Sequence, residues 1–161
     1  MTERKATLRR PYQYKESGLT NLFLIGITVH QCEQCRSILV DVPCRTDLYR
    51  SVALSLIKKP GFLMGEEIRY LRTWAGFPAQ KFAALLRVSP HHLSRVENGH
   101  LDSLGSAGDS LARILPMAVK EGAQAAFETL LGLADAPRRA VAESALPLVF
   151  ELTPNRWTAR D

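Results

Sequence analysis

The sequence has few of the features that mark secreted, membrane-spanning or disulfide-rich chains. Only 3 of its 161 residues are cysteine, and 7% are aromatic. The longest apolar run, residues 22–29, is interrupted by Gly26 and Thr28 and is too short to cross a bilayer. Residues 1–14 are polar and basic with no apolar segment behind them, unlike a secretory signal. We therefore expect a cytoplasmic protein that has no membrane partner.

Patterns typical of enzymes are also missing. The sequence has no glycine-rich phosphate loop, no pair of carboxylates spaced for acid–base catalysis and no Ser/His/Asp arrangement. His91 and His92 do not read as metal ligands, because adjacent residues on a helix point about 100° apart. We therefore expect that the protein is not an enzyme.

Composition and charge are those of a folded, mildly basic protein. Hydrophobic residues make up 46% of the chain and charged residues 23%, which excludes wholesale disorder. The net charge is +5, from 21 Lys and Arg against 16 Asp and Glu. A basic surface favours polyanions such as nucleic acid. So small an excess also occurs in many ordinary proteins, so charge alone does not decide the partner.

Local patterns predict a mainly α fold with a small N-terminal β-rich region. We expect a basic, mobile arm at residues 1–18, followed by strands at 21–30 and 37–42 and a helix at 46–58. Pro60-Gly61 has the composition of a linker. The expected domains are a β-rich domain (1–60), a helix-turn-helix domain (61–119), and a C-terminal helical segment with a β-hairpin that pairs protomers (120–161).

Residues 65–100 have the spacing of a helix-turn-helix. Helices are expected at about 66–75, at about 78–86, and from an N-cap at Ser89 to a stop at Asn98-Gly99. The third helix would bury Leu93 and Val96. Its outward face would carry polar groups able to contact base edges, namely Pro90, His91, His92, Ser94 and Arg95. Any solvated helix shows a similar face, so the pattern alone leaves both interpretations open.

A resemblance to a known family favours DNA binding. The residues that carry it are Ile68 to Arg72, Ala75-Gly76-Phe77, Phe82-Ala83, Leu86 to Ser89 and Leu93 to Gly99. Together they resemble the Xre/Cro-type helix-turn-helix regulators. The resemblance implies a homodimer that binds double-stranded DNA, usually as a repressor.

The same resemblance implies roles for individual residues. It implies an ion pair between Arg72 and Glu97. The positions that reach bases match His91 and Arg95, whereas Ser89 and Asn98 match backbone-contacting positions. The glutamine that anchors phosphate in the family is replaced here, so Gln80 or Lys81 would substitute for it. Arg87 stands where the family has a turn glycine and is expected to need a left-handed conformation. The candidate DNA-binding residues are Gln80, Lys81, Ser89, Pro90, His91, His92, Ser94, Arg95 and Asn98.

The N-terminal half resembles the MqsA-type (YgiT-like) zinc-finger/helix-turn-helix antitoxins. That family uses two Cys-x-x-Cys knuckles, whereas this chain has only one, Cys32 and Cys35. A structural zinc site needs four ligands. Cys44 and His30 could complete it, or two protomers could each donate a cysteine pair. The knuckle could also be a turn that binds no metal, or a thiol switch.

Three hypotheses follow. The first is a sequence-specific, dimeric transcriptional repressor. The second is an antitoxin that binds a toxin through residues 1–60 and represses its own operon. The third is a zinc or thiol sensor that uses Cys32 and Cys35.

Overall fold

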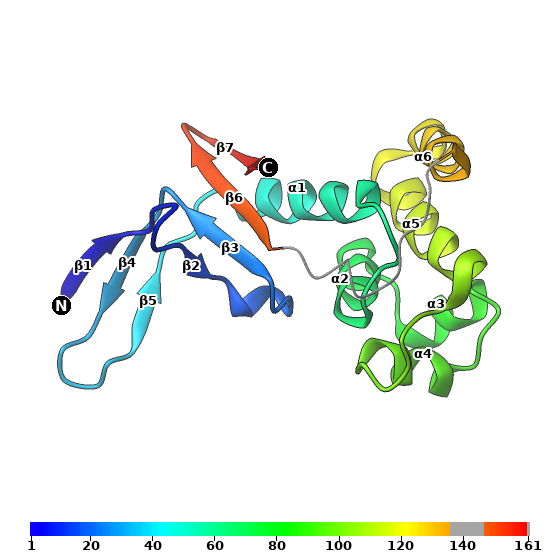
Figure 1. Ribbon diagram of the computed structural model, residues 1–161, viewed down its shortest axis with the longest axis horizontal. Coiled ribbons are helices and arrows are strands. Elements are labelled where there is room, and N and C mark those ends of the chain that lie inside the picture. The colour runs from blue at the N-terminus through cyan, green and yellow to red at the C-terminus, as the bar shows by residue number, and fades with distance from the viewer. Residues whose placement is uncertain (136–146, 161) are drawn as a thin grey trace. The chain divides into compact units, whose positions relative to one another are not determined.

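The computed structural model describes residues 1–135 and 147–160 (Figure 1). The chain forms two compact units, each described below by itself. The first unit consists of residues 1–52 and 147–161, and the second consists of residues 53–146. Whether the predicted segments 1–60, 61–119 and 120–161 fold independently stays a prediction.

The first unit contains two sheets. Strands β1, β4 and β5 form a three-stranded sheet, and strands β2, β3, β6 and β7 form a four-stranded sheet in that order. All pairings are antiparallel except that of β3 with β6, which is parallel. A short 3-10 helix, η1, spans Lys15–Ser17. The strands are β1 Thr2–Lys5, β2 Tyr12–Gln13, β3 Leu22–Ile25, β4 Thr28–Gln31, β5 Ile38–Val40, β6 Leu148–Thr153 and β7 Arg156–Arg160.

A glycine divides the apolar segment that was expected to form one strand at residues 21–30. Gly26 lies between β3 and β4 with a φ of 84°, a left-handed conformation that side chains disfavour. A Cβ atom there would also lie 3.0 Å from the carbonyl oxygen of Leu152. The bend sends β3 into one sheet and β4 into the other.

Trp157 connects the C-terminal strands to the rest of the first unit. Its side chain is 2% exposed, and its indole Nε1 donates to the carbonyl of Pro43 at 2.9 Å. Its backbone N–H donates to the carboxylate of Asp47 at 2.7 Å. These bonds satisfy the polar groups of a large buried aromatic residue, as burial requires.

Helices dominate the second unit. Helix α1, which begins in the first unit, spans Arg45–Lys58. It is followed by α2 Gly65–Ala75, α3 Ala79–Leu85, α4 Pro90–Glu97, α5 Gly105–Glu121 and α6 Ala123–Asp135. Helix α2 packs against α4 and α5, α3 against α4, and α5 against α6. Among the helices of the described residues, none combines the length and apolar character needed to cross a bilayer.

The expected fold class is wrong. The chain is 49% helix and 20% strand with two sheets, so it is not a mainly α protein, and an Xre-type helix-turn-helix bundle with C-terminal helices is not shown. The physical reason is long-range pairing. Strand β6, expected only in a local hairpin with β7, also pairs with β3 more than a hundred residues earlier in the chain, as in the register of Leu22 with Leu148. Local periodicity carries no signal for such a pairing.

Two other expectations concern the ends of the chain. The mobile basic arm at residues 1–18 is wrong, because β1 pairs with β4 and β2 pairs with β3. Ala6 adds two backbone hydrogen bonds, to Ile27 and from Gly26. Part of the C-terminal helical segment expected within 120–161, namely residues 136–146, lies outside the described residues.

Candidate nucleic-acid interface

Helix α4 is positioned by its own sequence. Ser89 has an extended backbone and its hydroxyl accepts a hydrogen bond from the N–H of His92 at 3.1 Å, with Pro90 at the first helical position. This is the cap that the sequence predicts. Leu93 and Val96 are buried, so the helix presents its opposite face to solvent.

An ion pair connects α4 to α2. The Nε of Arg72 lies 2.7 Å from one carboxylate oxygen of Glu97, and its Nη2 lies 3.0 Å from the other. The pair that the resemblance implied is therefore confirmed. The Glu97 side chain is only 6% exposed, and the two-pronged geometry fixes its direction as well as its distance. Arg72 also donates to the carbonyl of Phe77, so one side chain ties together α2, the turn after it and the end of α4.

Arg69 is a second connection that sequence reasoning missed. Its guanidinium donates to the carbonyl of Glu97 at 3.1 Å and to the side-chain oxygen of Asn98. Asn98 in turn donates to the carbonyl of Ser94 at 2.8 Å. The expected backbone-contacting residue Asn98 is thus held within the protein at the end of α4. The signal was present, because Arg69 precedes Arg72 by the three residues that place two side chains on one helix face.

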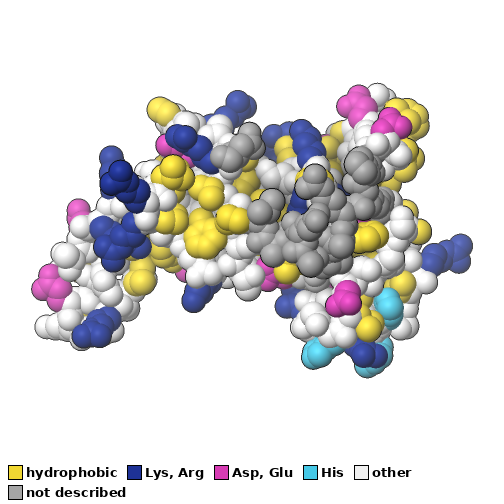
Figure 2. All heavy atoms as spheres, in the orientation of Figure 1, with side chains coloured by type: hydrophobic (Ala, Val, Ile, Leu, Met, Phe, Trp, Pro, Cys, Tyr) yellow, Lys and Arg dark blue, Asp and Glu magenta, His cyan; other side chains and the backbone are white. Residues whose placement is uncertain are grey.

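The candidate DNA-binding residues fall into two groups. Most lie on one exposed stretch of α4 and its N-cap. Figure 2 shows histidine side chains gathered with basic ones over the part of the molecule that Figure 1 assigns to α3 and α4. Gln80 and Lys81 lie apart from these, exposed in the first turn of α3. The α4 group consists of exposed Ser89, Pro90, His91, Ser94, Arg95 and Asn98 and half-buried His92.

The turn between α3 and α4 has the predicted strain. Arg87 has a φ of 58°, the left-handed conformation expected for it. The N–H of Val88 bonds to the carbonyl of Ala83 at 3.0 Å, and Ala83 is fully buried. The small side chain of Ala83 lets the two helices approach closely at this turn.

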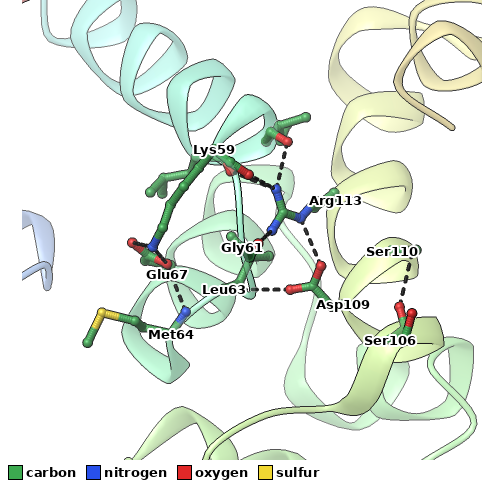
Figure 3. Close-up of polar contacts among 11 residues, drawn as sticks. Lys59, Gly61, Leu63, Met64, Glu67, Ser106, Asp109, Ser110 and Arg113 are labelled. Carbon is green, nitrogen blue, oxygen red and sulfur yellow. Dashed lines mark hydrogen bonds and ion pairs between the residues drawn. The ribbon is translucent and has the colours of Figure 1, made fainter. Parts of the chain in front are cut away.

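A buried polar cluster connects α5 to the end of α1 and to the segment before α2 (Figure 3). Arg113 is 1% exposed, and its Nε lies 3.0 Å from a carboxylate oxygen of Asp109. The Arg113 guanidinium also donates to four backbone carbonyls between the end of α1 and α2, and Asp109 accepts from the N–H of Leu63 at 2.7 Å. These acceptors are the carbonyls of Leu56, Ile57, Lys59 and Gly61. The cluster satisfies carbonyls at the end of α1 that would otherwise be buried without partners.

A second buried pair lies beside the first cluster. The ammonium of Lys59 lies 2.6 Å from each carboxylate oxygen of Glu67, which is fully buried. Glu67 also accepts from the N–H of Met64 at 2.8 Å, at the start of α2. Burial raises the pKa of the Glu67 carboxyl, and the charge of Lys59 opposes that rise. Sequence reasoning missed both clusters, because charged residues at these positions look like a solvated surface.

The cysteine knuckle lies in the first unit, in the turn between β4 and β5. All three cysteines are free thiols, and Cys35 is exposed. Within residues 1–135 and 147–160, no group of three or more His, Cys, Asp or Glu residues could hold a metal ion. His30, considered as a further ligand, lies 3.2 Å from a carboxylate oxygen of Glu3. Zinc bound by Cys32 and Cys35 therefore stays a prediction.

The environment of Cys35 favours its thiolate. The hydroxyl of Ser37 lies 2.9 Å from the Cys35 sulfur. This hydrogen bond, followed by bonds from the Ser37 backbone and the Cys32 thiol, lowers the pKa of Cys35 to about 7. The sequence alone did not indicate this role for Ser37.

The function of these surfaces has to be inferred from the chemistry of their own residues. No protein-family model, no curated protein and no solved structure matches this chain. What α4 offers is a short, rigid helix with hydrogen-bond donors and acceptors on its exposed face.

Proposed function

We propose that the protein binds double-stranded DNA and regulates transcription, and that α4 reads base edges in the major groove. The observation that carries the proposal is the exposed face of α4. His91, Ser94 and Arg95 are exposed on it, three and four residues apart and so on neighbouring turns. A major groove admits one α-helix, whose polar side chains can then reach base edges.

The chemistry of this face suits direct base recognition. Arg95 can donate two hydrogen bonds to the O6 and N7 acceptors of guanine, the commonest specific contact between proteins and DNA. Ser94 and His91 can each donate or accept. At the start of α4, Pro90 has no N–H and the N–H of His92 donates to the hydroxyl of Ser89, so the N–H of His91 is the amide left there for a phosphate.

The way α4 is held supports the same function. The Arg72–Glu97 pair, the bonds of Arg69 and the buried Leu93 and Val96 all restrain the helix before any ligand binds. A pre-organised surface loses less entropy on binding than a mobile one. The sequence resemblance of residues 68–99 to Xre/Cro-type regulators points to the same partner.

We also propose that the protein acts as a homodimer, because specific readers of this kind bind two half-sites. Helix α6 offers the surface for it. Phe127, Leu130 and Leu131 are 55%, 45% and 52% exposed on α6, and they lie three and four residues apart. Large exposed apolar stripes are typical of surfaces that bind another protein.

The test is binding to the DNA immediately upstream of the protein's own gene, compared with a scrambled duplex. We expect the protein to prefer the upstream DNA and its affinity to fall steeply with salt. Arg95→Ala is expected to lose about 1–3 kcal/mol of that preference, roughly 5- to 150-fold. Lys58→Ala is the matched control, because it removes the same charge from an exposed position of α1. Equal affinity for both duplexes, or a preference that survives Arg95→Ala, would overturn the proposal and favour a protein partner of residues 1–60.

A further inference from the structure

A tight turn after β1 presents a group of basic side chains in the first unit. The turn contains Arg9 and Arg10 and follows Arg4 and Lys5 in β1. Thr7 and Arg10 exchange two backbone hydrogen bonds, of 3.2 and 3.0 Å, which close the turn. These residues therefore belong to a fixed hairpin, and Figure 2 shows basic side chains gathered over this part of the unit.

The pairing of β1 with β4 separates Arg4 from Lys5. Successive side chains on a strand point to opposite faces of the sheet. Arg4 shares the face of Thr2, whose partner across the sheet is Gln31, and Lys5 shares the opposite face with Glu3. A hollow of about 580 Å³ is lined by Arg4, Arg10 and Gln31, and Glu3 also contributes to its lining, whereas Lys5 does not.

Nearby carboxylates are engaged elsewhere. Glu3 lies 3.2 Å from His30, and Glu33 lies 3.6 Å from the N-terminal ammonium. Glu16 accepts a hydrogen bond from Tyr12 at 3.2 Å. Within the described part of the chain, Arg4 and Arg10 form no ion pair. The lining of the hollow therefore carries two guanidinium charges against one carboxylate, that of Glu3, which lies against His30 rather than against an arginine, so its net charge is positive.

We propose that this hollow binds backbone phosphates of double-stranded DNA, as a contact separate from α4. The inference extends the proposed function, because it names a second surface for the same partner. A guanidinium matches phosphate oxygens with two parallel hydrogen bonds, and glutamine is a common neutral phosphate donor beside it. Such contacts supply affinity but no base preference.

The experiment measures the affinity of the full chain for a short duplex of mixed sequence across a range of salt concentrations. Each lost phosphate contact lowers the slope of log affinity against log salt by about 0.9, so the double variant Arg4→Gln/Arg10→Gln is expected to lower it by about 2. The matched control is Lys5→Gln/Lys15→Gln, which removes the same charge from the same unit outside the hollow. The single variant Arg10→Gln is expected to lower the slope by about 1. It should fold normally, because the contacts of Arg10 that close the turn come from its backbone and not from its side chain.

The outcomes separate this inference from the proposed function. An equal fall of the salt slope in both double variants would mean that the net charge of the protein alone sets the slope. An unchanged slope in Arg4→Gln/Arg10→Gln would mean that the hollow does not contact DNA. Either result overturns the inference, and so would poly-glutamate binding as tightly as DNA at equal charge. None of these results affects the loss of sequence preference expected for Arg95→Ala. Conversely, the protein could show a salt slope that depends on Arg4 and Arg10 but no sequence preference. That result would support phosphate binding by the hollow and would contradict base recognition by α4.

Discussion

Arg72 is the side chain that holds the most parts of the candidate interface together. It bonds to both carboxylate oxygens of Glu97 and to the carbonyl of Phe77. Its own side chain is 13% exposed, so its charge and that of Glu97 are largely removed from water. Removing one partner of such a pair leaves the other charge buried alone.

We therefore expect Arg72→Ala to lower the free energy of unfolding by about 3–5 kcal/mol. Arg69→Ala is the contrast, because Arg69 is 44% exposed and lies 3.7 Å from the same carboxylate. Glu97 keeps Arg72 as its partner when Arg69 is removed, and the guanidinium of Arg69 is partly in water, so this loss is expected to be only about 1 kcal/mol. Urea denaturation of both variants measures the difference. Equal losses in the two would show that burial of the Arg72–Glu97 pair does not determine its contribution.

Cys35 gives a pH-dependent prediction at the same scale. Because its pKa is lowered to about 7, its thiolate, the reactive form, is expected to become abundant as pH rises through about 7. Alkylation of each cysteine by iodoacetamide, followed by mass spectrometry, measures the midpoint. Ser37→Ala should move the Cys35 midpoint to higher pH, since the Ser37 hydrogen bond is the largest cause of the shift. The exposed thiol of Cys44 reports general changes in the same chain, and an unmoved Cys35 midpoint would contradict the role of Ser37.

At the scale of the element, the approach of α2 to α4 depends on a glycine. A Cβ atom at Gly65, the first residue of α2, would lie 1.9 Å from the carbonyl oxygen of Val96. No real Cβ tolerates such a distance, and the opposing atom is backbone at the end of α4. The two helices can therefore meet in this way only without a side chain at that position.

The substitution Gly65→Ala should destabilise the protein, by roughly 1–3 kcal/mol, because it forces α2 and α4 apart. Gly132→Ala is the matched control in α6, where the added Cβ would meet nothing within 4 Å. There alanine should raise stability by about 0.5–1 kcal/mol through helix propensity. Thermal unfolding of both variants distinguishes the two signs. A neutral Gly65→Ala would mean that the helices can separate freely.

At the scale of the whole molecule, the apolar stripe of α6 bears on the number of chains in the active species. Phe127, Leu130 and Leu131, which form this stripe, are exposed apolar side chains. If these three side chains pair two protomers, a charged side chain placed among them would be buried without a partner. The free-energy cost of burying that charge should exceed the free energy of association.

Leu131→Glu is therefore expected to convert a dimer to a monomer, measured by light scattering, and to weaken DNA binding at a two-half-site operator. Leu39→Glu is the matched control, because it makes the same change at a leucine that is 64% exposed in β5 of the first unit, and it should leave the dimer intact. A wild-type protein that is already monomeric at high concentration would refute the dimer, and equal effects of the two variants would place the interface elsewhere.

Part of the local structure follows from short-range preferences. The N-cap at Ser89 was predictable because capping preferences act over a few residues. The pair of Arg72 with Glu97 and the left-handed Arg87 were expected only from the resemblance to the Xre/Cro-type family. The exposed face of α4 followed from the burial of Leu93 and Val96, so most of the candidate site could be predicted.

The fold class and the buried charges depend on contacts between segments far apart in the sequence. The parallel pairing of β3 with β6 joins segments more than a hundred residues apart, and no local pattern specifies such a partner. Arg113 looks like a surface residue in the sequence, yet its carbonyl and carboxylate partners lie about fifty residues away as well as in its own helix. Arg4 and Arg10 share a hollow with Gln31 because the Thr7–Arg10 turn brings Arg10 back toward β1 and β1 pairs with β4. The periodicity of a segment predicts which of its side chains face the core. The residues that those side chains contact belong to other segments of the chain, which the local sequence does not specify.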